Sequence, residues 1–164
     1  MEIAGKNSGN YLFNRILLAG FIAGTLDAAA AIIDFYIKTG KSPAIVFIYI
    51  ASAVFGKEAY SMSQFIALVG LLFHYLIAII FSACYFLIYP KIKLLHWNNM
   101  INAIIYGIFV WIIMNMLVVP LTNAKHFPFN LWNALLAVFI LIICIGTPIT
   151  LMASSFYKNR SVIN

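Results

Sequence analysis

Long apolar segments alternate with short polar ones along most of the chain. We expect four membrane-spanning helices, over residues of about 15–38, 64–89, 100–121 and 131–157. At 1.5 Å per residue, each is longer than the roughly 30 Å hydrocarbon layer of a bilayer. The pattern predicts an all-α fold, a four-helix bundle that forms one membrane domain over residues 1–164. Residues typical of helix ends and membrane interfaces stand near the boundaries, namely Gly40, Pro43, Pro90, Lys91, Lys93, Pro120, Asn123, Lys158 and Arg160.

A shorter apolar segment, residues 43–55, separates the first two spans. Ser42 precedes it, Pro43 begins it and Gly56 follows it, which is typical of a short helix. It is too short to cross a bilayer. We therefore expect an additional helix that either lies in the membrane interface, which we favour, or enters the protein as a re-entrant segment.

The composition excludes a soluble globular domain and a disordered chain. Hydrophobic residues make up 65% of the sequence, charged residues 9%, and the mean hydropathy is +1.02. Soluble domains have roughly 45–50% apolar and about 25% charged residues. The first apolar segment is too long for a signal peptide and contains Asp27 and Asp34, so we expect it to stay in the mature protein. Cys84 and Cys144 lie in apolar segments, where we expect them to act as small hydrophobic residues.

The excess of basic residues predicts topology and contact with membrane lipids, and no basic run indicates nucleic-acid binding. Ten Lys and Arg against four Asp and Glu give a net charge of +6. With four spans, the N-terminus, the second loop and the C-terminus share one side of the membrane. That side carries more of the basic residues, which favours cytoplasmic termini. The residues are Lys6, Arg15, Lys91, Lys93, Lys158 and Arg160 on that side, and Lys38, Lys41, Lys57 and Lys125 on the other.

Small and polar residues share one face of the first span: Gly20, Gly24, Asp27, Ala31 and Asp34. Gly20 and Gly24 form a Gly-x-x-x-Gly pair, so we expect helix packing at this point. The spacing of Asp34 and Lys38 predicts an i, i+4 ion pair.

Asp27 lies about twelve residues inside the first span, where an unpaired carboxylate costs on the order of 3 kcal/mol. His74 lies at a comparable depth in the second span, so an Asp27–His74 contact is geometrically feasible. Asn115 and Thr147 would extend these two into a buried polar cluster across all four helices. Three interpretations follow: structural contacts, a proton- or ion-responsive site, or a ligand pocket.

Gly146, Thr147 and Pro148 interrupt the last span. Pro148 has no backbone N–H and leaves the carbonyl of Cys144 without its usual partner. We expect a helix kink at Gly146 and Pro148, which either fits a curved neighbour or lines a cavity.

No catalytic constellation, metal site or cofactor site is expected. The chain has no His-Glu-x-x-His, Cys-x-x-Cys, Gly-x-Ser-x-Gly or phosphate-binding glycine motif. His96 and His126 fall in predicted loops, so His74 alone could not provide the two ligands of an intramembrane haem.

One set of residues spread along the chain forms a further pattern: Gly20–Asp27, Ser42, Pro43, Ile50–Ser52, Phe55, Gly56, Gly70, His74 and Gly146–Pro148. In this pattern the chain resembles the YagU-like group of uncharacterised bacterial inner-membrane proteins. The resemblance covers residues 16–157 and implies a small four-helix protein of the bacterial inner membrane without an assigned activity. Asp27 and His74 match the pattern of the group, but Leu141–Ile143 stand where the group often has a histidine.

The sequence leaves three functions open. The first is a structural or accessory membrane component, as a homo-oligomer or within a larger assembly. The second is a small proton- or ion-coupled transporter with Asp27 as the protonatable site. A carboxylate in the first of four helices also resembles the small multidrug transporters, which are shorter and lack the extra apolar segment. The third, an enzyme for lipid-like substrates with His74 as acid or base, lacks a second catalytic group.

Overall fold

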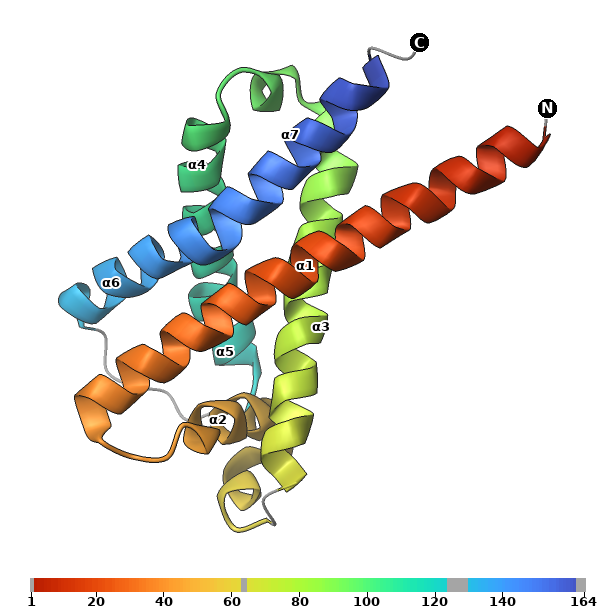
Figure 1. Ribbon diagram of the computed structural model, residues 1–164. Helices are drawn as coiled ribbons and strands as arrows, with labels where there is room; N and C mark the ends of the chain where they lie inside the picture. Colours follow the sequence, from red (N-terminus) through yellow and green to blue (C-terminus); the bar gives the residue numbers. More distant parts are fainter. Residues whose placement is uncertain (1, 63–64, 124–129, 162–164) are drawn as a thin grey trace.

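The computed structural model describes residues 2–62, 65–123 and 130–161, and all of its regular structure is helical (Figure 1). The chain begins with α1 (Glu2–Thr39), α2 (Ala44–Phe55), the 3-10 turn η1 (Gly56–Tyr60) and α3 (Phe65–Ile88). It continues with η2 (Tyr89–Lys91), η3 (Lys93–His96), α4 (Asn99–Ile112), η4 (Ile113–Val118) and α5 (Val119–Leu121). The last three elements, α6 (Leu131–Leu141), η5 (Ile142–Gly146) and α7 (Thr147–Ser161), form one continuous helix.

Four helical stretches are long and apolar enough to cross a membrane: Gly9–Thr39, Phe65–Lys91, Asn99–Leu121 and Leu131–Asn159. Together with the short helix α2, they confirm the predicted fold class. The first helix begins well before residue 15, because a basic side chain such as Arg15 does not itself end a helix. The predicted start of the second span at residue 64 lies outside the described residues, as do Lys125 and His126.

The helices are arranged so that the two termini lie at one end of the bundle and α2 lies at the other (Figure 1). We call these the terminal end and the distal end. Helix α1 crosses α3 obliquely, and α6 and α7 run along a similar diagonal across α4 (Figure 1). Helix α2 packs beside α3 at the distal end, where Ala51 and Ser52 are buried.

The main core fills the terminal half of the bundle. Small residues of α1, Ala19 and Ala23, are fully buried there and allow close contact with larger side chains of the neighbouring helices. The remaining core residues are Ile16, Phe81, Tyr85, Phe86, Tyr89, Tyr106, Val110, Ile145, Ile149, Ala153 and Phe156.

Glycines mark the points of closest helix approach. A Cβ atom on Gly20 would lie 2.7 Å from the Cα atom of Ile79 on α3, and one on Gly107 would lie 2.6 Å from the Cα atom of Ile142. Real Cβ atoms do not come this close, so larger residues would push these helices apart. Gly24 faces Tyr75 and Ala78 of α3, extending the same contact along α1.

The last span departs from regular α-helix just before Pro148. Residues Ile142–Gly146 form a π-helical segment, and the hydroxyl of Thr147 donates a 2.9 Å hydrogen bond to the carbonyl oxygen of Ile142. Such a wider turn accommodates a residue without a backbone N–H. The sequence predicted a helix kink at Gly146 and Pro148, and the structure has a π-helical segment directly before Thr147 and Pro148.

Candidate functional site

Asp27 lies near the middle of α1 and is partly exposed. Its carboxylate lies within electrostatic range of the side chains of His74 of α3 and Cys144 of η5. It makes no hydrogen bond or ion pair with any residue that the structure describes. Asp27 thus lies near side chains of two neighbouring helices but forms no hydrogen bond or ion pair with them.

The side chain of His74 is held against the backbone of α1. Its Nε2 atom lies 2.8 Å from the carbonyl oxygen of Gly24, about one helical turn before Asp27. A carbonyl oxygen only accepts, so Nε2 carries the hydrogen and donates it. The ring also makes edge-on contacts with Phe47 of α2 at 6.4 Å and with Tyr75 at 5.7 Å between centroids. Three helices therefore fix the imidazole close to Asp27.

The expected buried cluster of four polar residues is wrong in two respects. Asp27 is partly exposed and Asn115 is exposed, so neither is a buried group. Asn115 and Thr147 each donate a side-chain hydrogen bond within their own helix. The acceptors are the carbonyl oxygens of Trp111 at 3.0 Å and Ile142 at 2.9 Å, respectively. A carbonyl one turn earlier on the same helix is always within reach of such side chains, whereas a partner on another helix depends on exact packing.

A cavity of about 840 Å³ occupies the distal half of the bundle. We call it the distal cavity. Its volume falls within the range of roughly 300–1,000 Å³ typical of small-molecule sites. The polar residues that line it are Asp34, Lys38, Thr39, Tyr49, Tyr60, Trp111, Asn115, Asn130 and Asn133. The apolar residues are Ala31, Phe35, Ile45, Val46, Met116, Val119, Ala134 and Ala137.

The charges in the distal cavity balance. The Nζ atom of Lys38 lies 2.8 Å from the Oδ2 atom of Asp34, which confirms the predicted i, i+4 ion pair. Burial raises the pKa of the Tyr49 hydroxyl above its ordinary value, and the nearby Tyr60 hydroxyl raises it further. The Tyr49 hydroxyl is therefore neutral at physiological pH. The cavity combines one ion pair with neutral hydroxyl and amide groups on an apolar background.

The sequence did not reveal this cavity, because its walls come from α1, α2, η1, α4, η4, α5 and α6 and from the turns next to them. A signal was present in the amides of Asn115, Asn130 and Asn133, which are unusual in strongly apolar stretches. Asp27 stands one turn before Ala31 on the same face of α1, so it lies just beyond the inner end of the cavity.

No group of three or more His, Cys, Asp or Glu side chains that could hold a metal ion occurs among the described residues.

The four apolar spans and the helical bundle define a multi-pass integral membrane protein. No family model matches the chain, and neither a curated protein nor a solved structure matches it.

Proposed function

We propose that the protein is a structural or accessory component of the bacterial inner membrane without catalytic activity. The packing of the terminal half carries this proposal. There, side chains of all four spans form one core, and Ala19, Ala23, Phe86, Ile149 and Ala153 are completely inaccessible. A bundle closed in this way fits a scaffold better than a pore.

The polar groups within the core also support this proposal. Ser82 donates to the carbonyl oxygen of Ile16 at 2.9 Å, and Tyr106 donates to that of Phe81 at 2.6 Å. Each bond joins a side chain to the backbone of a neighbouring helix. Such bonds hold helices together and use up the polar groups that would otherwise line a path for ions.

The proposal includes orientation and partners. The termini face the cytoplasm, because the terminal side carries more basic residues. Large apolar side chains such as Leu72, which is 68% exposed, cover the outside of the bundle and contact lipid, a second copy or another membrane protein. Assignment to the YagU-like group rests on the sequence resemblance and implies the same class of protein.

In-cell photocrosslinking tests the accessory role. A benzophenone amino acid replaces Leu72 on the outer face of α3, and the control replaces Lys57, an exposed residue of η1. We expect a discrete crosslinked product of defined mass from the Leu72 position, either a dimer of this chain or a complex with one other protein. If Leu72 gives only crosslinks to lipid, the protein has no membrane partner on that face and the proposed role loses its support.

A second candidate function is proton- or ion-coupled transport through Asp27. The position of Asp27 favours it, since the carboxylate lies near His74 and Cys144 and stands one turn from Ala31 in the wall of the distal cavity. In this mechanism Asp27 would take up and release the coupling ion while a substrate occupies the cavity.

Proteoliposomes containing a pH-sensitive dye distinguish the two candidates. The structural role predicts that the purified protein dissipates a pH gradient no faster than empty liposomes. Transport predicts faster dissipation that Asp27→Asn abolishes and Asp34→Asn, the control on the same helix, retains. Flux that survives Asp27→Asn would contradict both the structural role and transport through Asp27.

A further inference from the structure

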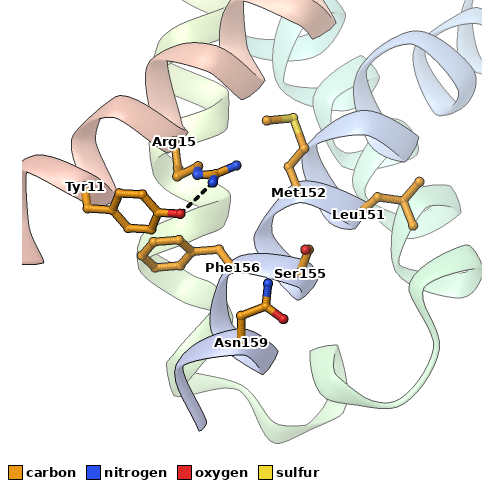
Figure 2. A pocket seen from close by; sticks show the side chains of 7 residues that line it. All are labelled: Tyr11, Arg15, Leu151, Met152, Ser155, Phe156 and Asn159. Atoms are coloured by element: carbon orange, nitrogen blue, oxygen red, sulfur yellow. Dashed lines mark hydrogen bonds between the residues drawn. The ribbon is translucent and has the colours of Figure 1, made fainter. Parts of the chain in front are cut away.

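A second cavity, of about 370 Å³, lies near the terminal end between α1 and α7 (Figure 2). We call it the terminal cavity. Tyr11 and Arg15 of α1 form one wall, and Met152, Ser155, Phe156 and Asn159 of α7 face them (Figure 2). Leu151 completes the lining. Neither the accessory role nor the Asp27 mechanism makes use of this cavity.

Arg15 is held in a defined position in this cavity. A terminal nitrogen of its guanidinium donates a 2.5 Å hydrogen bond to the Tyr11 hydroxyl, and its Cζ atom lies 4.9 Å from the centroid of the Tyr11 ring. The Tyr11 ring in turn stacks on the buried ring of Phe156, with centroids 5.7 Å apart. The guanidinium is therefore anchored to the core through two aromatic rings.

Among the described residues, no carboxylate forms an ion pair with Arg15. The ion pair of Lys38 with Asp34 is the one found among the described residues, and the terminal cavity has no acidic residue in its lining. A guanidinium has five N–H donors in a planar fork, and the bond to Tyr11 uses one of them. The remaining donors suit an anion with several oxygens, such as a phosphate group.

The lining of the terminal cavity becomes more polar along α7 toward the terminal end. Helix α7 runs toward the terminal end, so Leu151 and Met152 lie deeper in the bundle than Ser155 and Asn159. With the spans crossing a bilayer, Leu151 and Met152 lie on the side of the acyl chains, and the hydroxyl and the amide lie on the side of the headgroups. A soluble phosphate compound would have no use for the apolar part of the cavity.

We propose that the terminal cavity binds an anionic phospholipid. The guanidinium of Arg15 pairs with the phosphodiester oxygens, Ser155 and Asn159 form hydrogen bonds with the glycerol headgroup, and an acyl chain lies along Leu151 and Met152. Anionic lipids are preferred over phosphatidylcholine, because the cavity offers a choline group no acidic partner. The proposal goes beyond the accessory role and does not depend on it.

Native mass spectrometry of the purified full-length protein, titrated with phosphatidylglycerol, tests the site. We expect Arg15→Gln to weaken the association constant of the first lipid about tenfold, since a charge-assisted phosphate contact is lost. Arg15→Lys should retain part of the affinity, because lysine keeps the positive charge but lacks the planar set of N–H donors of the guanidinium. The matched control is Lys93→Gln, which removes an exposed charge from η3 outside the cavity and should change the constant less than twofold.

One further variant and a comparison of ligands complete the test. Ser155→Leu places an apolar side chain at an exposed position of the cavity wall, so it should block the lipid without disturbing the core. Equal losses in Arg15→Gln and Lys93→Gln would overturn the site in favour of general attraction to a basic surface. Equal affinity for phosphatidylcholine, or displacement of the lipid by millimolar glycerol 3-phosphate, would overturn the anionic lipid as its ligand.

Discussion

The hydroxyl of Tyr106 on α4 donates a 2.6 Å hydrogen bond to the carbonyl oxygen of Phe81 on α3, and both residues are buried. This bond joins the second and third spans in the middle of the core. The ring of Tyr85 packs on that of Tyr106 with centroids 4.7 Å apart, yet the Tyr85 hydroxyl has no hydrogen-bond partner among the described residues. Tyr85 and Tyr106 thus pack against each other in the core, but of their two hydroxyls the structure shows a hydrogen bond for that of Tyr106 alone.

Tyr106→Phe should lower the free energy of unfolding by about 0.5–1.5 kcal/mol, the usual value of an interhelical hydrogen bond in a membrane protein. Tyr85→Phe should leave the stability unchanged or raise it, because it removes a buried hydroxyl that has no partner. Unfolding of the purified variants in mixed micelles by sodium dodecyl sulfate measures both. A loss for Tyr85→Phe as large as that for Tyr106→Phe would show that the bond to Phe81 is not what stabilises the contact.

Gly146→Ala should destabilise the bundle by about 1–3 kcal/mol, the typical cost of overpacking. A Cβ atom at Gly146 would overlap the backbone carbonyl group of Ala103, and backbone cannot turn aside as a flexible side chain can. Helix propensity works in the opposite direction, since alanine is favoured over glycine in a helix by up to about 1 kcal/mol. The same unfolding assay measures the net effect.

The matched control is Gly9→Ala on α1, where no heavy atom lies within 4 Å of the added Cβ. Here only the propensity gain remains, so the stability should stay the same or increase. The contact of the third and fourth spans through Gly146 would be contradicted if the two alanine variants were equally stable relative to the wild type.

The sequence predicted the elements of the fold well, because each depends on many residues or on strong local signals. Hydropathy averaged over some twenty positions defines a span even where one residue is charged, as at Asp27. The short helix α2 was confirmed, since Pro43 and Gly56 limit it from both sides. Gly56 has a φ of 64°, a conformation that glycine adopts without strain, and its N–H bonds to the carbonyl of Ser52.

The candidate site was less predictable, because it depends on which partner each polar group finds. His74 bonds to the backbone of Gly24 and not to the nearby side chain of Asp27, and Asn115 turns back to its own helix. Helix periodicity shows which residues share a face but not how neighbouring helices meet. For the same reason Arg15 counted only as one more basic residue, although it lines a cavity with residues about 140 positions later in the chain.

The orientation of the termini can be tested with two exposed lysines at opposite ends of the bundle. Lys57 lies on η1 at the distal end and Lys93 on η3 at the terminal end (Figure 1). Each is replaced by cysteine in a protein in which Cys84 and Cys144 are changed to alanine. With cytoplasmic termini, a membrane-impermeant maleimide should label Lys57→Cys in spheroplasts and Lys93→Cys only after the membrane is permeabilised. The reverse pattern would place the termini outside the cytoplasm.

The ion pair of Asp34 and Lys38 should contribute little to stability, although it lies on the wall of the distal cavity. Their side chains are 33% and 40% exposed, so solvent and salt screen the attraction. A double-mutant cycle of Asp34→Asn and Lys38→Met in the unfolding assay should give a coupling energy of about 0.3–0.5 kcal/mol, decreasing at high ionic strength. A coupling well above 1 kcal/mol that is insensitive to salt would mean that the pair is shielded from water. In that case the cavity would be closed at its polar end, and a ligand could reach it only from the bilayer.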